Sequence, residues 1–362
     1  MHNRRSEEIS SKSEDISFGS QLLKLPAEDK LRADILNAFK EVVAFYTPTL
    51  VTFGGAFFAS FPLFYSTSFG GAYWVWIIIL FAFIVQAVSY EFRSKPENFL
   101  GKNVFDGFLF ANGLLSTVLL GAAVSTFFTG SHFIIDSDRH SQWTMASRGL
   151  EAALNIQNLS LGLAVFFLSR VLASLYFFRS ISDDEIIARV KKQLLYDAVP
   201  FVAFFLLFTG MLLLKNGFAV KPSTGEVFME PYKYFHNLIQ MPLVAVLFLA
   251  GVVLVLTGII LPVVSYVKYG EKGIWFSGLG TVLAVFSLFL LAGFNNTSYY
   301  PSVADLQSSL TIENSSSSHY TLKAMSYVSL IIPFELLYII YVWRLINKKK
   351  TEASDLEGEH VY

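Results

Sequence analysis

Eight long apolar stretches restrict what this chain can fold into. They lie approximately at residues 42–66, 72–90, 104–128, 158–178, 197–214, 238–262, 274–294 and 322–345. A helix that rises about 1.5 Å per residue needs about 20 apolar residues to cross a hydrocarbon core about 30 Å thick. Because lipid offers the backbone no hydrogen-bond partners, each stretch must pair its own backbone groups, as a helix does. The sequence therefore predicts an all-α fold, a polytopic integral membrane helical bundle with about eight transmembrane helices.

The composition agrees with a membrane protein and excludes several kinds of partner. Hydrophobic residues make up 54% of the 362 residues and charged residues only 15%, against about 25% in soluble domains. A net charge of −1 leaves no basic excess to offset phosphates, so no nucleic-acid partner is expected. The chain has no cysteine, which excludes thiolate metal sites and iron–sulfur ligation.

Polar segments flank the predicted transmembrane domain, which covers residues 42–346. Residues 1–17 are predicted to form a disordered N-terminal tail, and residues 347–362 a C-terminal tail. Between the N-terminal tail and the domain, residues 18–41 place Leu23, Leu31 and Ile35 at helical spacing, which predicts a cytoplasmic amphipathic segment.

The distribution of basic residues predicts the orientation of the bundle. If residues 22–41 lie on one side, that side holds 17 Lys and Arg residues and the other side holds 6. Basic loops favour the cytoplasm, so the chain is predicted to be multi-pass with both termini cytoplasmic. Two long loops, residues 129–157 and 295–321, are then both predicted on the outer side.

Histidine, the commonest axial ligand of haem, is missing from the predicted spans. None of the six histidines lies inside a span, and Met211, Met241 and Met325, which lie in or near spans, are more typical of packing. The chain also lacks a phosphate-binding loop and hydrolase motifs. We therefore assign it no catalytic, cofactor-binding or metal-binding residue, and it is predicted to bind no cofactor alone.

Ionisable residues inside spans are costly, and each is a candidate site. Arg170 in the fourth span and Glu335 in the eighth both fall about 12–13 residues in from the outer side, about 18–20 Å deep. Touching helices would let them form an ion pair. Such a pair is structural, faces a partner subunit, or takes part in proton movement. Pro333 is expected to kink the eighth helix.

Other polar residues have simpler interpretations. Asp106 and Asp197 begin the third and fifth apolar stretches, where helix capping is favoured over catalysis. The amides of Gln86, Asn112 and Gln240 are expected to bond between helices.

Two segments resemble subunit II of the cytochrome bd quinol oxidases. The first is TFGGAFFASFPLFY at residues 52–65, followed by YEFRSK at residues 90–95. It is similar to the family's helix of the form GGA-x-F-A-x-x-P-x-x-Y and to its acidic-x-R-S-K loop. The second runs from Pro301-Ser302 through SLTI at residues 309–312 to YTLKAM at residues 320–325. It is similar to the outer loop before the family's last helix. The resemblance covers roughly residues 18–350.

The resemblance implies a subunit of a quinol:oxygen oxidoreductase in the bacterial cytoplasmic (inner) membrane. The partner would be the haem-bearing subunit I, which carries haem b and haem d, and quinol would be the substrate of the complex. A small accessory subunit is a further partner that the resemblance allows. This chain would support subunit I, help to conduct cytoplasmic protons, and have no activity alone.

The sequence departs from the family at two places. The family's first span is missing, which indicates either a truncated or misplaced start or a variant that has lost a helix. The Asp that the family places on a proposed proton route falls at Ala44, and Glu41 is the nearby carboxylate. Glu91 and Arg93 match family positions. Arg93 shapes the cytoplasmic mouth, contacts lipid phosphate, or is only a positive-inside anchor.

The alternative function is a secondary transporter or permease, because eight spans with few intramembrane charges also suit that class.

Overall fold

The computed structural model describes residues 54–93, 100–180, 184–265 and 269–346. Within them, seven helices are long and apolar enough to cross a membrane. The predicted tail and amphipathic segments at residues 1–17, 18–41 and 347–362 lie outside the described residues. So does the first part of the predicted span at 42–66, whose described part is helical at residues 54–60 and in α3 (Pro62–Tyr65). The prediction of a polytopic helical membrane bundle is confirmed.

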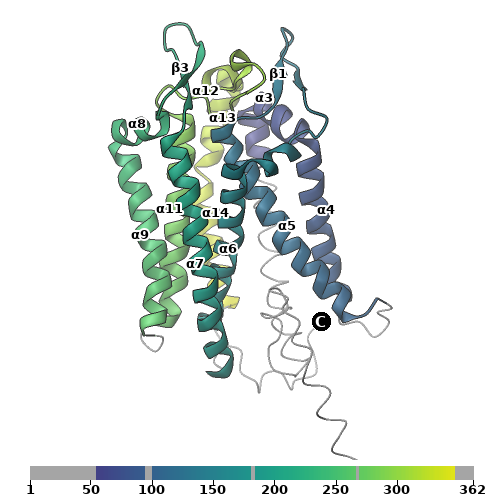
Figure 1. The fold of residues 1–362 in the computed structure, drawn as a ribbon, viewed down its shortest axis with the longest axis vertical. Helices are drawn as coiled ribbons and strands as arrows, with labels where there is room; N and C mark the ends of the chain where they lie inside the picture. The colour runs from purple at the N-terminus through teal and green to yellow at the C-terminus, as the bar shows by residue number, and fades with distance from the viewer. Residues whose placement is uncertain (1–53, 94–99, 181–183, 266–268, 347–362) are drawn as a thin grey trace, which may run out of the picture.

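The long helices run lengthwise through the molecule, and all but the last pack against a long helix next to them in the sequence (Figure 1). The helix pairs α4–α5, α5–α6, α6–α7 and α9–α11 make the most extensive contacts. Their bounds are α4 (Tyr73–Phe92), α5 (Lys102–Thr129), α6 (Ile156–Ser180), α7 (Asp184–Leu214), α9 (Pro242–Val264) and α11 (Gly273–Gly293).

Helices α9 and α11 approach closely because glycines face each other at two levels. A Cβ atom added to Gly251 would lie 2.7 Å from the backbone nitrogen of Ala284, and one added to Gly258 would lie 2.6 Å from the carbonyl oxygen of Gly273. Lipid provides no hydrophobic force between apolar helices, so close backbone packing of this kind holds them together. Gly54 and Gly55, the small residues of the first span, have no described atom within 4 Å of such a Cβ.

We expect Gly258→Ala to destabilise the α9–α11 pair, because the added methyl group overlaps the α11 backbone. Overpacking of this kind costs about 1–3 kcal/mol. Gly278→Ala on α11 is the matched control, because nothing lies within 4 Å of its added Cβ. Ala in place of Gly in a helix favours folding by about 0.5–1 kcal/mol. Thermal unfolding of the purified protein should therefore shift downward for Gly258→Ala alone. Equal shifts for the two variants would contradict the packing.

One end of the bundle carries two β-hairpins, and we call it the hairpin end. β1 (Phe133–Ile135) pairs with β2 (Ser141–Trp143), and β3 (Gly217–Val220) pairs with β4 (Val227–Glu230), both antiparallel. The loop that follows α11 joins both hairpins, through bridges from Ser302 to Ser131 and from Thr297 to Ala219. The two long loops predicted on one side of the membrane therefore do meet at one end.

An aromatic cluster packs the hairpin end against the membrane helices. Tyr300 is buried, stacks on Phe133 with ring centroids 5.4 Å apart, and meets Phe64 edge-on at 5.1 Å. The serines at 315–318 continue this packing: Ser315 bonds to the hydroxyl of Tyr299 at 2.8 Å, and Ser318 caps the next helix. The hydroxyl of Ser315 therefore fills a buried polar position, and that of Ser318 caps a helix. Here α12 (Ile312–Ser315) begins with a capping box at Thr311.

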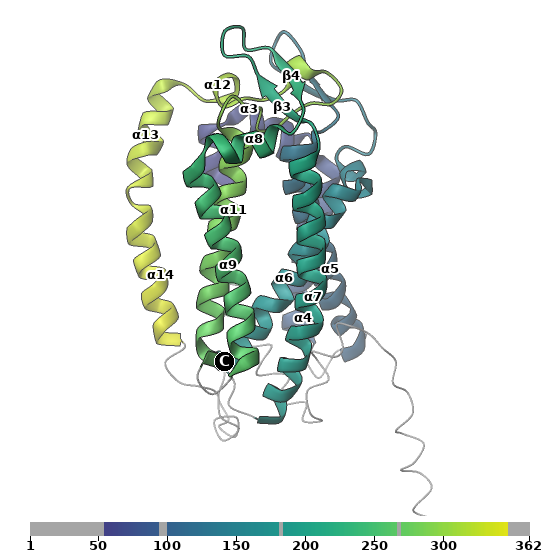
Figure 2. The same ribbon diagram turned by 60° about the vertical axis from the view of Figure 1, so that its left-hand side comes forward.

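The last predicted span is two helices, α13 (His319–Ser329) and α14 (Ile332–Ile346). The break at residues 330–331 directly precedes Pro333, whose ring disrupts the helix before it, so the predicted kink is confirmed. Figure 2 shows α13 and α14 standing apart from the other helices. In the segment His319–Val342, which is long enough to span a membrane, no residue of the most apolar part is buried inside the chain.

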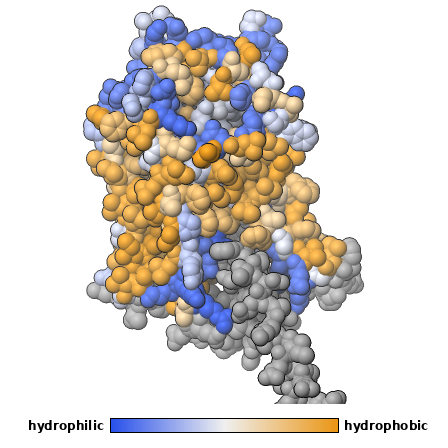
Figure 3. Space-filling view, viewed as in Figure 1, coloured by the Kyte–Doolittle hydropathy of each residue, from blue (hydrophilic) through white to orange (hydrophobic). Residues whose placement is uncertain are grey.

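Figure 3 shows the surface that this arrangement presents. On the face shown, a broad apolar band crosses the middle of the molecule, with hydrophilic regions above it at the hairpin end and below it. A band of this kind is the expected signature of a bilayer-spanning bundle.

Candidate functional site

No cluster of three or more His, Asp or Glu residues able to hold a metal occurs among the described residues. The four described histidines, His132, His140, His236 and His319, lie in loops or short segments at the hairpin end or at the start of α13. The polar features that remain are two arginine–aspartate pairs and one network of amides and charges at the hairpin end.

The first pair joins α6 to α7 inside the bundle. Arg170 Nε donates to Asp197 Oδ1 at 2.8 Å, and Gln193 Nε2 donates to Asp197 Oδ2 at 2.9 Å. Asp197 is fully buried and Arg170 is 9% exposed. Arg170 lies 14 residues from the start of α6 at Ile156, which is about 21 Å along the helix. Both charges are therefore remote from the hairpin end and shielded from solvent.

The guanidinium of Arg170 is only partly satisfied. Its Nη2 atom is buried and has no hydrogen-bond partner among the described residues, while its central carbon lies 5.7 Å from the centre of the Phe166 ring. A charge buried in this way depends on its counter-ion, because removal of one partner leaves the other uncompensated in a medium of low dielectric constant.

The predicted pair between Arg170 and Glu335 is wrong. Asp197 takes the place expected for Glu335, which is exposed on α14. The reason is the length of α7, whose membrane-length part begins at Ile187 rather than near residue 197. Asp197 therefore lies well inside the span, at a level where Arg170 reaches it.

The same extension overturns the capping role predicted for Asp197, which lies 13 residues after the start of α7. The capping role predicted for Asp106 is also wrong. α5 begins at Lys102 after Gly101, and its first turn holds no acidic residue. Asp106 instead accepts two hydrogen bonds from the buried Arg93, from Nε at 2.5 Å and from Nη2 at 3.2 Å. This bidentate pair ties the end of α4 to the start of α5.

The four candidate residues that the structure describes are not assembled into one site. Glu91 is exposed in the last turn of α4, two residues from Arg93 and at the end of the bundle opposite the hairpins. Arg170 is inside the bundle and Glu335 is on a separate helix, whereas Glu41 lies outside the described residues. The sequence did not predict the Arg93–Asp106 pair, although a basic residue and an acidic residue that are 13 positions apart between two apolar stretches are a signal for it.

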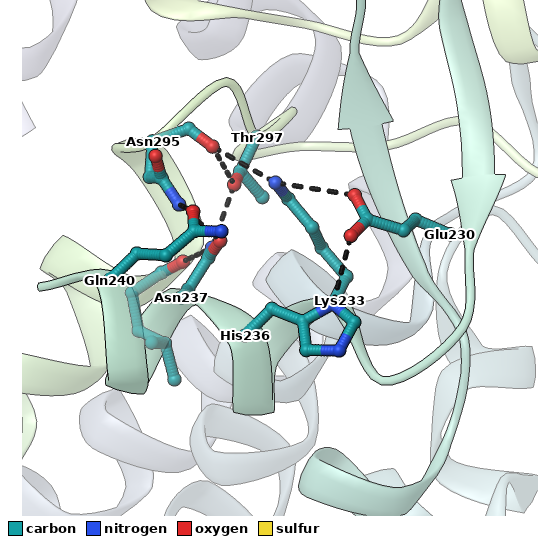
Figure 4. A network of polar contacts seen from close by, with 8 residues as sticks. Glu230, Lys233, His236, Asn237, Gln240, Asn295 and Thr297 are labelled. Carbon is teal, nitrogen blue, oxygen red and sulfur yellow. Dashed lines mark hydrogen bonds and ion pairs between the residues drawn. The ribbon is translucent and has the colours of Figure 1, made fainter.

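A third polar cluster lies at the hairpin end, around α8 (Lys233–Gln240), and Figure 4 shows it closely. Lys233 Nζ lies 3.5 Å from Glu230 Oε2 and donates to the carbonyl oxygen of Asn295 at 3.0 Å. His236 Nδ1 lies 3.0 Å from Glu230 Oε1. Burial opposes ionisation of Glu230, but the hydrogen bond with His236 and the charge of Lys233 outweigh burial and lower the pKa of Glu230.

Amides extend this cluster to the loop after α11. Asn295 Nδ2 donates to Asn237 Oδ1 at 2.9 Å and to Gln240 Oε1 at 2.6 Å, and Asn237 Nδ2 donates to Thr297 Oγ1 at 2.8 Å. The prediction that these amides bond between helices is not borne out for two of them. Gln240 bonds to Asn295 in the loop after α11, and the side-chain oxygen of Asn112 accepts from Ser116 on the same helix.

The fold and its polar residues define a helical membrane subunit held together by buried ion pairs, with no metal-binding cluster in its described part. The sequence matches the family described as cytochrome bd terminal oxidase subunit II over residues 14–346. The chain therefore belongs to that family. The alternative of a secondary transporter is set aside.

Individual relatives agree with this assignment. Cytochrome bd-I ubiquinol oxidase subunit 2 of Escherichia coli strain K12 is 24% identical over 327 residues, covering 86% of this chain and 83% of that protein. Cytochrome bd ubiquinol oxidase subunit 2 of Bacillus subtilis strain 168 is 28% identical over 315 residues, covering 85% and 82%. The fold also resembles a chain of the bd oxidase from Geobacillus thermodenitrificans, with a TM-score of 0.58, 12% identity and 92% of each chain covered.

We expect Asp197→Leu to be strongly destabilising, because it leaves Arg170 charged, buried and without its counter-ion. The loss should be about 3–5 kcal/mol, and the double variant Arg170→Met/Asp197→Leu should recover most of it. Glu226→Gln is the control: its pair with Lys221 has similar geometry at 2.7 Å but is half-exposed, so the cost should be about 0–1 kcal/mol. Denaturant unfolding in detergent measures all three. An Asp197→Leu variant as stable as the control would show that the pair is not needed.

Proposed function

We propose that this chain is the haem-free second subunit of a quinol:oxygen oxidoreductase, and that it supports a partner subunit that carries haem b and haem d. The family match over residues 14–346 is the observation that carries this proposal. The relatives named ubiquinol oxidase subunit 2 supply the substrate, quinol. The partner would oxidise quinol and reduce dioxygen to water.

The membrane is proposed to be the bacterial cytoplasmic membrane, with both termini in the cytoplasm. In the sequence, the segments predicted to share one side with the termini hold 17 Lys and Arg residues, against 6 on the other side, and basic segments are retained on the cytoplasmic side. The hairpin end would then face outward. Arg93, Asp106 and the exposed Glu91 would form a polar surface at the cytoplasmic end, where protons would enter.

The surface proposed to receive the partner includes α13 and α14. Large apolar side chains on α14 are exposed, among them Phe334, Leu337 and Tyr338. Glu335 lies among them, and its carboxylate has no hydrogen bond or ion pair with described residues. A carboxylate in hydrocarbon is costly without a partner, so Glu335 is proposed to face a polar group of the other subunit. Arg170, already paired, is proposed to be structural.

Purification from native membranes through a tag on the C-terminus tests the assignment. The proposal predicts a larger co-purifying polypeptide and a reduced-minus-oxidised absorption spectrum with haem b and haem d bands. A colourless preparation that contains this chain alone would contradict it.

The docking face is tested in the same membranes by a photoreactive benzoylphenylalanine. At position 334 on α14 it should cross-link to the haem-bearing polypeptide. At position 249 on α9, also exposed, it should not. Cross-linking from 249 but not from 334 would place the partner elsewhere.

A further inference from the structure

The short helix α8 has the opposite amphipathicity to a helix of a water-soluble protein. Its polar residues Lys233 and Asn237 are buried, whereas Phe235 is 46% exposed and Ile239 is 63% exposed. Phe235 and Ile239 are four residues apart and share one face. In water, large apolar side chains would favour the inner face and a lysine the outer one. The outer face of α8 therefore requires an apolar environment.

The position of α8 brings this face to the edge of the bilayer. Only Met241 separates α8 from α9, and the 23 residues of α9 are about 34 Å long, close to the thickness of a hydrocarbon core. The start of α9 therefore marks one boundary of the membrane. Figure 2 shows α8 lying across the bundle axis at that level, beneath the β3–β4 hairpin.

The polar network fixes which face points outward. Lys233 is bound to the loop after α11 and lies close to Glu230, and Asn237 bonds to Thr297 and to the carbonyl oxygen of Leu291 at 3.1 Å. Rotation of α8 to bury Phe235 and Ile239 would break these contacts and expose the carbonyl groups that they satisfy. A helix held in this way keeps its apolar face outward whatever covers it.

We propose that α8 is a membrane-surface anchor, with Tyr232, Phe235 and Ile239 in contact with the lipid of the leaflet at the hairpin end. Exposed apolar residues follow those of α8 on α9, where Leu243 is 71% exposed and Val246 and Leu249 are also exposed. The exposed apolar surface along a full span identifies the occupant as lipid. Tyr and Phe favour this interfacial depth, where one end of the ring is wet. The polar groups of Glu230 and His236 lie at headgroup level. The inference is independent of the proposed function.

Spin labelling tests the anchor directly, because the chain contains no cysteine. Single variants Phe235→Cys and Ile239→Cys are labelled with a nitroxide in the purified protein in phosphatidylcholine–phosphatidylglycerol nanodiscs. Collision rates are then measured with oxygen, which concentrates in lipid, and with a water-soluble nickel chelate. Preparations in which this chain carries no substitution are labelled in the same way. They give the background nitroxide signal from cysteines of any co-purified partner.

Two further positions calibrate the result. Val246→Cys on α9 supplies the lipid reference, and Ser223→Cys at the exposed β3–β4 turn supplies the water reference. The proposal predicts an oxygen-to-nickel ratio at 235 and 239 above that at 223 and towards that at 246. A ratio equal to that at 223 would place α8 in water. Low collision rates with both reagents would show that protein covers it. Either result overturns the proposal.

Discussion

The absence of water in the bilayer core is the constraint on which this structure depends. Every charge that enters the core must find its partner within the protein. Arg170 and Asp197 meet this requirement from neighbouring helices, and Gln193 supplies a further hydrogen bond to the carboxylate. The pair therefore fixes the level at which α6 and α7 pack, in addition to the apolar contacts between them. Close contact between glycines fixes α9 against α11 in the same way.

The two ends of the bundle are stabilised differently. At the hairpin end, the loop after α11 bridges both β-hairpins, and the amides around α8 link that loop to the membrane helices. At the opposite end, the Arg93–Asp106 pair joins the end of α4 to the start of α5. The α13–α14 segment takes almost no part in either set of contacts, which is why its apolar surface is available to a partner subunit. The outward apolar face of α8 has the same physical origin as the apolar surface of α13–α14. In both, an apolar environment surrounds the protein, and in α8 the polar side chains point into a polar interior at the edge of the membrane.

Most of the fold could be predicted from the sequence, because a run of about 20 apolar residues has one low-energy conformation in lipid. The length of α7 could not. Residues Ile187, Val190 and Leu194 are buried at helical spacing, but the exposed Arg189 and Lys192 between them lower the average hydropathy. The predicted span consequently began too late, Asp197 was interpreted as a cap, and Glu335 became the partner expected for Arg170. Depth along a helix could be estimated from sequence, whereas the choice between two acids at similar depth depends on which helices touch.

The network around α8 was missed for a related reason. Its members are far apart in sequence, and single amides and charges in loops carry no pattern.

The central claim is that this chain contributes a scaffold and supplies no axial ligand to the haems of the complex. The most direct test replaces all six histidines, His2, His132, His140, His236, His319 and His360, with glutamine in the complex purified from native membranes. Glutamine at position 236 can still bond to Glu230. The account predicts a reduced-minus-oxidised spectrum with every haem band at the intensity, per complex, of the unsubstituted protein. Loss of a haem band from an otherwise assembled complex would contradict it, because a histidine of this chain would then be a ligand.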